Sequence, residues 1–289
     1  PSPNPEHREA LELGIRLCEE VHPDLLLATD PDTDRVGVAV KDGDDYQLIT
    51  GNEMGVLLLD YLCRTRTEQG TMPKDPVAVT TIVSTSLADQ VAAHYGVEMR
   101  RCLTGFKYIG GIIAELEAGG HPERFVFGFE ESYGYLAGTH ARDKDAVVTS
   151  MLICQMARYY RTQGKTLYAA MQDLYATYGF HCNSTLSFTF EGISGAKKMA
   201  DLMDAFRTKA PAEIAGLAVE SVLDYEAGVN GLPSANVIEF DLAGGNKAIV
   251  RPSGTEPKIK VYVFSVGPTA DAADELNQRI GDVMTSRMS

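Results

Sequence analysis

The stretch 77–129, VAVTTIVSTSLADQVAAHYGVEMRRCLTGFKYIGGIIAELEAGGHPERFVFGF, decides the fold of this chain. Strand-like runs at 77–83, 97–102 and 124–129 alternate here with helix-like stretches at 87–95 and 108–118. This alternation predicts a mostly parallel sheet covered by helices. In such sheets ligands lie beyond the carboxyl ends of the strands, so we expect functional residues in the loops after Val83, Cys102 and Phe129.

The same rhythm extends to either side of this stretch and then changes. Further helix-like segments lie at 52–64, 146–161 and 167–178. From about residue 180, strand-like segments occur at 184–190, 219–225, 236–242, 247–250 and 258–266, with helices near 194–208 and 270–284. This second pattern predicts a separate α+β domain with an antiparallel sheet. The glycine-rich segment 242–246 is expected to form a hairpin turn within that domain.

The N-terminal region adds one more helix and a few strands. Asn4-Pro5 predicts the N-cap and first residue of a helix in which Leu11, Ile15 and Cys18 recur at helical spacing. Strand-like runs follow at 25–28, 36–40 and 46–49, the last two around a turn at 42–44. We therefore predict an α/β protein with mixed, mostly parallel sheets sandwiched by helices, followed by a C-terminal α+β domain with an antiparallel sheet.

Composition narrows the possible partners. The 289 residues carry a formal net charge of −14, which argues against nucleic acid or an anionic membrane as a partner held by general electrostatics. An anionic substrate would need a local basic cluster. The 5 cysteines are scattered, which indicates neither a disulfide framework nor a zinc site and fits a reducing, cytoplasmic setting. No apolar run reaches the ~18 residues needed to span a bilayer.

The acidic segment Asp30-Pro31-Asp32-Thr33-Asp34-Arg35 follows the predicted strand at 25–28. Three ionised carboxylates this close repel one another unless a metal or a paired cation neutralises them, and oxygen ligands favour Mg²⁺ or Ca²⁺. An EF-hand loop starting at Asp30 fails, because it needs Gly and Glu where the chain has Arg35 and Lys41. Arg35 instead suggests that a metal and a guanidinium together orient a phosphate. A solvated Asp-rich turn is the alternative.

Three further loops carry side chains suited to a phosphorylated sugar. Residues 128–134 place two acids, a hydroxyl and two glycines at a strand end, although an ordinary polar turn has a similar composition. Residues 251–258, RPSGTEPK, combine an arginine, hydroxyls and a glycine in a cradle for an oxyanion that is not a Walker A loop. Segments 104–107 and 142–145 add lysines, for which simple solvent exposure is the alternative explanation.

Together these loops resemble one family. A D-P-D-x-D-R loop, a T-G-x-K loop, an E-E-S-x-G loop and an R-P-S-G-T-E-P-K loop occur in this order in the α-D-phosphohexomutases, the phosphoglucomutase/phosphomannomutase superfamily. The sugar loop together with residues 142–146 is most similar to phosphoglucomutases of the branch related to phosphopentomutases. By resemblance, residues 1–45 are the end of the family's domain 2, residues 46–177 are domain 3 and residues 178–289 are domain 4.

The resemblance implies a role for each loop. In this family a phosphoserine donates its phosphoryl group to a hexose monophosphate, and a sugar bisphosphate is the intermediate. The implied ligands of one Mg²⁺ ion are Asp30, Asp32 and Asp34, with Arg35 and Lys107 in support. The implied substrate-binding residues are Glu130, Ser132, Lys144, Arg251, Ser253, Gly254 and Thr255. The implied substrate is a hexose phosphate or, in the related branch, a pentose phosphate.

One departure from the family pattern concerns the nucleophile. The family's serine lies in a T-x-S-H-N-P-like loop, and no Ser-His pair occurs in this sequence. The resemblance therefore implies a C-terminal part of a phosphoglucomutase that is inactive alone. A phosphomannomutase or phosphopentomutase is an alternative, as is a noncatalytic sugar-phosphate-binding module. A haloacid-dehalogenase-like phosphatase is disfavoured, because Asp34 stands where that family has Thr or Val and the Arg251 loop would go unexplained.

Overall fold

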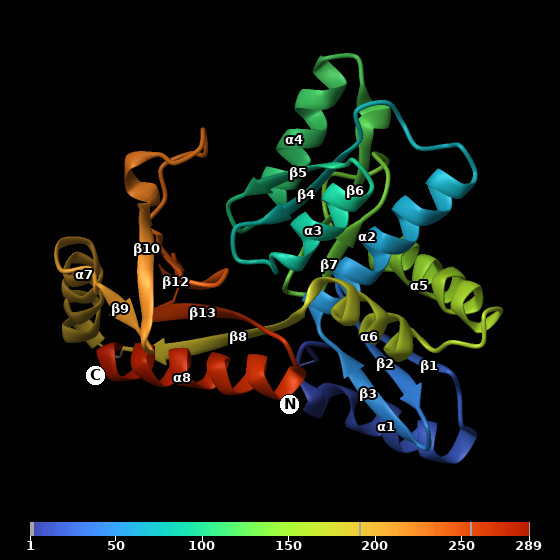
Figure 1. Cartoon of the computed structure of the whole chain (residues 1–289), viewed down its shortest axis with the longest axis horizontal. Helices are drawn as coiled ribbons and strands as arrows, with labels where there is room; N and C mark the ends of the chain where they lie inside the picture. Colours follow the sequence, from blue (N-terminus) through green and yellow to red (C-terminus); the bar gives the residue numbers. More distant parts are fainter. Residues whose placement is uncertain (1–2, 191, 255, 289) are drawn as a thin grey trace. The chain divides into compact units, whose positions relative to one another are not determined.

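The structure is a computed structural model that describes residues 3–190, 192–254 and 256–288 (Figure 1). It consists of two compact units, Pro1–Tyr178 and Gly179–Ser289. Among the described residues, no helix has the length and apolar character required to cross a membrane.

The first unit begins with a helix beside a small antiparallel sheet. Helix α1 (Arg8–Val21) precedes strands β1 (Leu25–Thr29), β2 (Val36–Asp42) and β3 (Asp45–Ile49), which pair in that order. The predicted apolar stripe is confirmed, because Leu11, Ile15 and Cys18 are the buried residues of α1. The predicted helix start is wrong. The carbonyl of Asn4 accepts the N–H of His7 at 3.1 Å and closes a separate turn, so that α1 begins three residues later than the turn's proline.

The second sheet of this unit confirms the predicted α/β alternation. Its strands are β4 (Val77–Thr81), β5 (Glu98–Cys102), β6 (Phe125–Glu130) and β7 (Gly134–Leu136), in the order β5-β4-β6-β7. The first three are parallel, whereas β7 returns antiparallel to β6 as a short strand that the sequence analysis missed. The helices are α2 (Gly51–Glu68), α3 (Leu87–His94), α4 (Phe106–Ala118), α5 (Ala146–Arg161) and α6 (Leu167–Tyr178), with a 3-10 turn at Pro122–Arg124.

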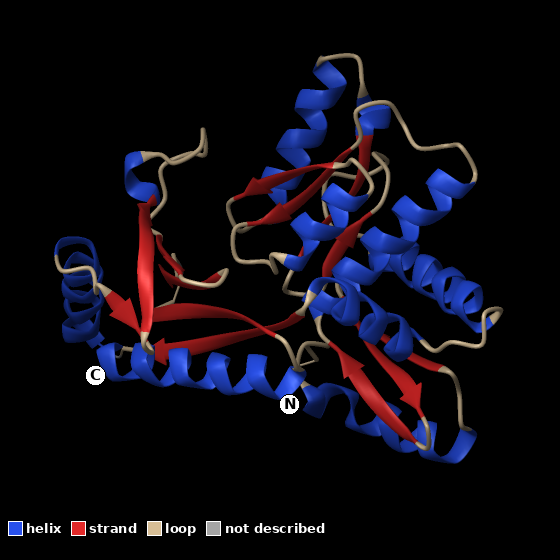
Figure 2. Cartoon of the chain, in the orientation of Figure 1, coloured by secondary structure: helices blue, strands red, loops and turns tan. Residues whose placement is uncertain are grey.

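Helices cover both faces of this sheet (Figure 2). Alternate residues of β4 point to opposite sides. Val77 and Val79 pack in one cluster with the apolar residues of α4, while Ala78 belongs to a larger cluster with α2, α3, α5 and α6. The central strands β4 and β6 are therefore buried on both faces, as expected for a parallel sheet.

The second unit is a six-stranded antiparallel sheet with two long helices. The strand order is β8-β13-β12-β11-β10-β9. The strands are β8 (Phe180–Thr189), β9 (Glu213–Ile214), β10 (Leu217–Asp224), β11 (Ile238–Leu242), β12 (Asn246–Pro252) and β13 (Lys258–Gly267). Helices α7 (Gly192–Thr208) and α8 (Ala270–Met288) share one core with these strands, and a 3-10 turn lies at Tyr225–Ala227. The predicted glycine hairpin is confirmed by the pairing of Leu242 with Asn246.

Candidate active site

The acidic segment forms the connection between β1 and β2. Thr29 pairs with Val36, so residues 30–35 make a closed loop at the end of the two strands. The side chain of Asp30 holds this loop together, because its Oδ1 accepts the N–H groups of Asp34 at 3.1 Å and Arg35 at 3.0 Å. The left-handed conformation of Thr33, with φ of 60°, allows the sharp turn that these bonds close.

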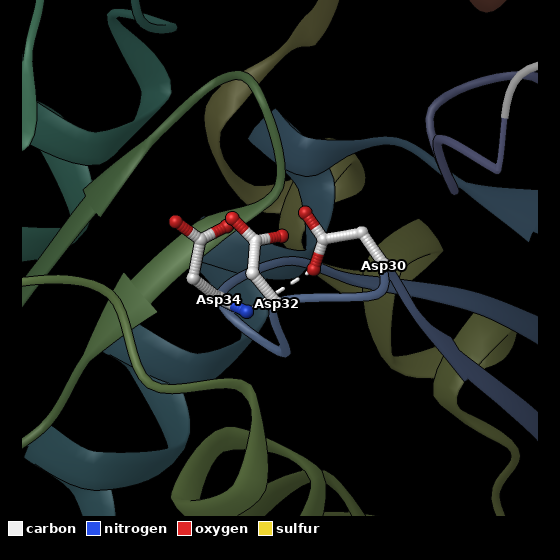
Figure 3. A group of neighbouring side chains, drawn as sticks. All are labelled: Asp30, Asp32 and Asp34. Atoms are coloured by element: carbon white, nitrogen blue, oxygen red, sulfur yellow. Dashed lines mark hydrogen bonds between the residues drawn. The ribbon is translucent and has the colours of Figure 1, made fainter.

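The three carboxylates of this loop converge, as Figure 3 shows. One oxygen from each of Asp30, Asp32 and Asp34 lies within 4.8 Å of the others. The side chains of Asp30 and Asp34 are only 11% and 25% exposed, whereas Asp32 faces solvent. Converging, partly shielded carboxylate oxygens are the ligand type that Mg²⁺ prefers. The donor set therefore fits the Mg²⁺ that the family resemblance implies.

Two cations partly neutralise this carboxylate cluster. The ammonium of Lys144 lies 2.8 Å from Oδ2 of Asp34, and Nε of Arg35 lies 3.9 Å from a carboxylate oxygen of both Asp30 and Asp34. Arg35 is also held by Glu6, whose carboxylate lies 2.6 Å from its Nη1. The negative charge of the cluster is thus matched in part by fixed positive groups of the protein.

The pKa values of two of these carboxyl groups move in opposite directions. Burial raises the pKa of Asp34, and the charges of Asp30 and Asp32 raise it further, so that the ion pair with Lys144 does not restore the usual value. Burial also acts to raise the pKa of Asp30, but the N–H groups of Arg35 and Asp34 outweigh it and leave that pKa lowered. Of these two carboxyl groups, Asp34 is therefore the one whose charged form is disfavoured by burial and by its acidic neighbours.

The predicted sugar loop is the hairpin between β6 and β7. Glu130 pairs with Gly134 across residues 131–133, and Tyr133 adopts a left-handed φ of 67° at the turn. The side chain of Glu130 is 5% exposed and accepts the N–H of Gly105 at 2.8 Å. Burial raises the pKa of Glu130, and the Gly105 N–H and the nearby cations Lys144 and Arg35 offset only part of that rise.

The carboxylate cluster and the sugar loop are joined by direct contacts. The N–H of Val36 donates to the carbonyl of Tyr133 at 3.2 Å, and Arg35 forms a β-bridge with Gly134. The N–H of Ala146 donates to the carbonyl of Thr33 at 3.2 Å, which ties the start of α5 to the acidic loop. The first unit therefore brings together six predicted site residues. These are Asp30, Asp32, Asp34, Arg35, Glu130 and Lys144.

The sugar loop and the start of α4 carry the two other predicted site residues of the first unit. Ser132 is half-buried in the hairpin that Glu130 opens. Lys107 is exposed in the first turn of α4, where its ammonium lies 4.9 Å from the centroid of the Tyr108 ring. Gly105, which binds Glu130, is the N-cap residue of the same helix. The T-G-x-K segment thus contributes a main-chain contact to the site.

The structure also shows supporting residues that sequence reasoning missed. The carboxylate of Glu131 accepts the hydroxyls of Thr81 at 3.1 Å and Ser84 at 3.5 Å, which ties the sugar loop to the end of β4. A Cβ atom on Gly51 would lie within 3.0 Å of backbone atoms of residues 131–133, so α2 packs directly on this loop. Glu6 is another such supporting residue, because its carboxylate pairs with the guanidinium of Arg35. These partners are distant in sequence from the residues they support. Only Gly51, a glycine at the start of a helix, is a sequence signal that another backbone packs closely there.

The predicted phosphate loop lies in the second unit, between β12 and β13. The N–H of Ser253 donates to the carbonyl of Lys258 at 2.7 Å, which closes the hairpin, and Gly254 has open space around it. Arg251 donates to the hydroxyl of Tyr262 at 3.1 Å and has Lys260 as its neighbour on the next strand. Two cations therefore stand side by side near the loop. Thr255 lies outside the described residues. That this loop and the carboxylate cluster bind the same substrate stays a prediction.

Comparison with known proteins matches nearly the whole chain to one family. The family models for alpha/beta/alpha domain II, alpha/beta/alpha domain III and the C-terminal domain of phosphoglucomutase/phosphomannomutase match residues 1–43, 50–178 and 195–282. A phosphoglucomutase of Staphylococcus aureus is 38% identical over 293 residues, which cover 96% of this chain and 51% of that protein. The chain thus spans about half the length of the curated relatives it matches.

Solved structures show the same fold. Parafusin, a phosphoglucomutase from Paramecium in its open form, superposes with a TM-score of 0.69 at 18% identity, covering 97% of this chain and 50% of that one. An N-acetylphosphoglucosamine mutase from Aspergillus fumigatus, solved with glucose 1,6-bisphosphate, has a TM-score of 0.50 at 14% identity and covers 92% of this chain and 49% of its own. On these matches, the chain belongs to the α-D-phosphohexomutase superfamily, the phosphoglucomutase/phosphomannomutase family of mutase enzymes.

Proposed function

We propose that this chain is part of a phosphoglucomutase that interconverts glucose 1-phosphate and glucose 6-phosphate through a phosphoserine enzyme and a bisphosphate intermediate. The observation that carries the proposal is the contact between the carboxylate cluster and the sugar loop. The N–H of Val36, directly after the acidic segment, donates to the carbonyl of Tyr133 in the sugar loop at 3.2 Å. Lys144, whose stem crosses Gly134 of that loop, lies 2.8 Å from Asp34. A metal site beside a loop with sugar-binding groups meets the main requirement of phosphoryl transfer to a sugar.

The carboxylates of Asp30, Asp32 and Asp34 would hold Mg²⁺. When bound, this ion lowers the cost of charge that builds on a transferred phosphoryl group. Asp30 orders the acidic loop by accepting hydrogen bonds from two of its N–H groups, so the protein itself fixes the position of this ligand. Arg35, anchored by Glu6, would steady the same phosphoryl group as a fixed cation.

The remaining residues would bind the two ends of the substrate. Glu130 would accept hydrogen bonds from sugar hydroxyls, and Ser132 could donate to them or accept from them. The burial of Glu130 strengthens the bonds that it accepts. Lys107 and Lys144 would add positive charge near the sugar phosphate. The hairpin residues Arg251, Ser253, Gly254 and Thr255 would grip the phosphate that is not reacting, so that binding energy far from the reacting atoms positions the sugar.

The proposal includes the domain boundaries that the resemblance implies. Residues 1–45 would belong to domain 2, residues 46–177 would form domain 3, and residues 178–289 would form domain 4. The partners would be a hexose phosphate and its bisphosphate, a ligand that the Aspergillus fumigatus relative was solved with. Because no Ser-His loop of the family type occurs in these 289 residues, we expect no turnover from them alone.

The test is a mutase assay on the full gene product that contains this chain. We expect glucose 1-phosphate to be converted to glucose 6-phosphate, with loss of turnover in Asp32→Asn. The isolated 289-residue chain should bind glucose 1,6-bisphosphate by calorimetry and show no turnover. Turnover by this chain, free of host enzyme, would refute the proposed dependence on a serine elsewhere.

Substrate choice is tested in the same assay with mannose, ribose and glucosamine phosphates. A higher kcat/KM for mannose or pentose phosphates would replace the proposed function with phosphomannomutase or phosphopentomutase. Bisphosphate binding by the full gene product without turnover of any of these sugars would instead indicate a noncatalytic sugar-phosphate-binding module.

A further inference from the structure

We propose that Lys144 is shared between the metal site and the substrate: it pairs with Asp34 when the metal site is empty and turns to the anionic sugar phosphate when a divalent cation is bound. Metal and sugar phosphate would then strengthen each other's binding. This inference rests on the proposed function, because it takes the carboxylate cluster as a metal site and the sugar loop as a sugar site.

The position of Lys144 between two acidic groups is the first observation. Its ammonium lies 2.8 Å from Asp34 and 3.6 Å from the exposed carboxylate of Asp143, and its side chain is only 14% exposed. The positive charge of Lys144 also acts on the carboxyl group of Glu130, where it offsets part of the rise in pKa that burial causes. The ammonium thus stands at the junction of the acidic loop and the sugar loop, within reach of both.

The path of the lysine side chain is the second observation. A Cβ atom added to Gly134 would lie 2.7 Å from Cγ of Lys144 and closer still to its Cδ. The aliphatic stem of Lys144 therefore runs directly over Gly134, in the space that any other residue would fill. Because Gly134 pairs with Glu130 in the hairpin, the stem is guided by the sugar loop while its charged end reaches the acidic loop.

The contrast with Arg35 is the third observation. Arg35 also neutralises the carboxylate cluster, but Glu6 holds its guanidinium at 2.6 Å, outside the acidic loop. A lysine stem has rotatable bonds along its length, unlike the anchored guanidinium, and Asp34 is the closest carboxylate partner of Lys144. A divalent ion on the cluster would repel both cations and weaken the attraction of Asp34 for the ammonium. Arg35 would stay in place, whereas Lys144 would become available to another anion.

Thermodynamic linkage turns this exchange into a measurable coupling. If a bound cation frees Lys144 for the sugar phosphate, then the sugar phosphate must tighten cation binding by the same factor. The experiment measures the Kd of Mn²⁺, as a spectroscopic probe for Mg²⁺, by electron paramagnetic resonance on the 289-residue chain with and without glucose 1,6-bisphosphate. We expect the bisphosphate to tighten Mn²⁺ binding roughly 5- to 50-fold.

Two variants test whether Lys144 carries this coupling. In Lys144→Met, Mn²⁺ alone should bind about tenfold more tightly, because a cation next to a ligand has been removed, and the bisphosphate effect should fall to about twofold or less. Gly134→Ala should behave in the same way, since the added methyl group displaces the stem of Lys144 without removing its charge. A purely structural role for Lys144 would weaken Mn²⁺ binding instead.

Matched controls separate this effect from general loss of charge or of glycine. Lys165→Met removes an exposed lysine that pairs with Asp173 at 2.5 Å, and Gly111→Ala adds a methyl group where nothing lies within 4 Å. Both should keep the coupling of the unsubstituted chain. Unchanged or weaker Mn²⁺ binding in Lys144→Met would overturn this inference alone. Failure of the unsubstituted chain to bind Mn²⁺ at a site that Asp32→Asn abolishes would overturn the proposed metal site as well.

Discussion

Replacing Gly55 by alanine should destabilise the first unit, although the same change stabilises most helices. Gly55 lies within α2, on the side that packs against β6. A Cβ atom at this position would approach three ring atoms of Phe129 to less than 3.0 Å, closer than real Cβ atoms come to their neighbours. Phe129 is 1% exposed and stacks on Phe127 at a centroid distance of 5.8 Å, so a shift of its ring would press on packed neighbours.

Two opposing effects set the magnitude. Alanine gains about 1 kcal/mol over glycine inside a helix. Inserting a methyl group into a packed core costs about 1–3 kcal/mol. Because three ring atoms of a fully buried side chain must move together, we expect the upper part of that range and a net loss of about 1–2 kcal/mol. Phe129 directly precedes Glu130, so the same displacement should disturb the sugar loop.

The measurement is hydrogen exchange of the amides in α2 and β6 under native conditions, which isolates the first unit from the second. Gly111→Ala is the control, since α4 offers open space there and the change should stabilise the unit by up to about 1 kcal/mol. Phe129→Leu should relieve part of the clash, so Gly55→Ala and Phe129→Leu together should cost less than the sum of the two. If Gly55→Ala stabilised the unit as Gly111→Ala does, the packing argument would fail.

Three further changes test charged and capping groups. Asp145→Ala removes the N-cap of α5 and should cost about 1 kcal/mol in urea unfolding near neutral pH. Burial acts to raise the pKa of Asp145, but the N–H of Val148 and the other partners of the carboxylate leave that pKa lowered. The contribution of Asp145 to folding stability is therefore present above about pH 4 and is lost as the pH falls through the folded pKa. The difference in unfolding free energy between the native protein and Asp145→Ala should shrink in acid. Asp60→Ala should cost about 1–3 kcal/mol of unfolding free energy, because it removes the buried carboxylate that accepts the hydroxyl of Tyr160 at 3.1 Å; retention of the native Tm would contradict this. Glu130→Gln keeps the shape of the side chain and should lower kcat/KM of the full gene product about tenfold or more with little change in stability, and unaltered kinetics would remove Glu130 from the sugar site.

Much of the secondary structure could be predicted because it depends on local patterns. The strand-like runs around 77–83 and 97–102 are short, apolar and followed by helical periodicity, and the structure has β4, β5 and their helices there. Strand β7 is not predictable from the sequence, because its three buried residues are too few to show the alternation of apolar and polar side chains typical of a strand. The sequence places the start of α1 too early, because an asparagine that caps a helix and one that closes a turn look alike in sequence.

The acidic loop could likewise be recognised from the sequence alone, because its three carboxylates and its arginine are neighbours along the chain. The tertiary structure decided which distant groups meet them. Lys144 pairs with Asp34, and its stem requires the bare backbone of Gly134, a relation that no spacing in the sequence encodes. Local patterns follow from the geometry of helices and strands, whereas such partnerships arise only when the packing of separate elements brings their side chains within bonding distance.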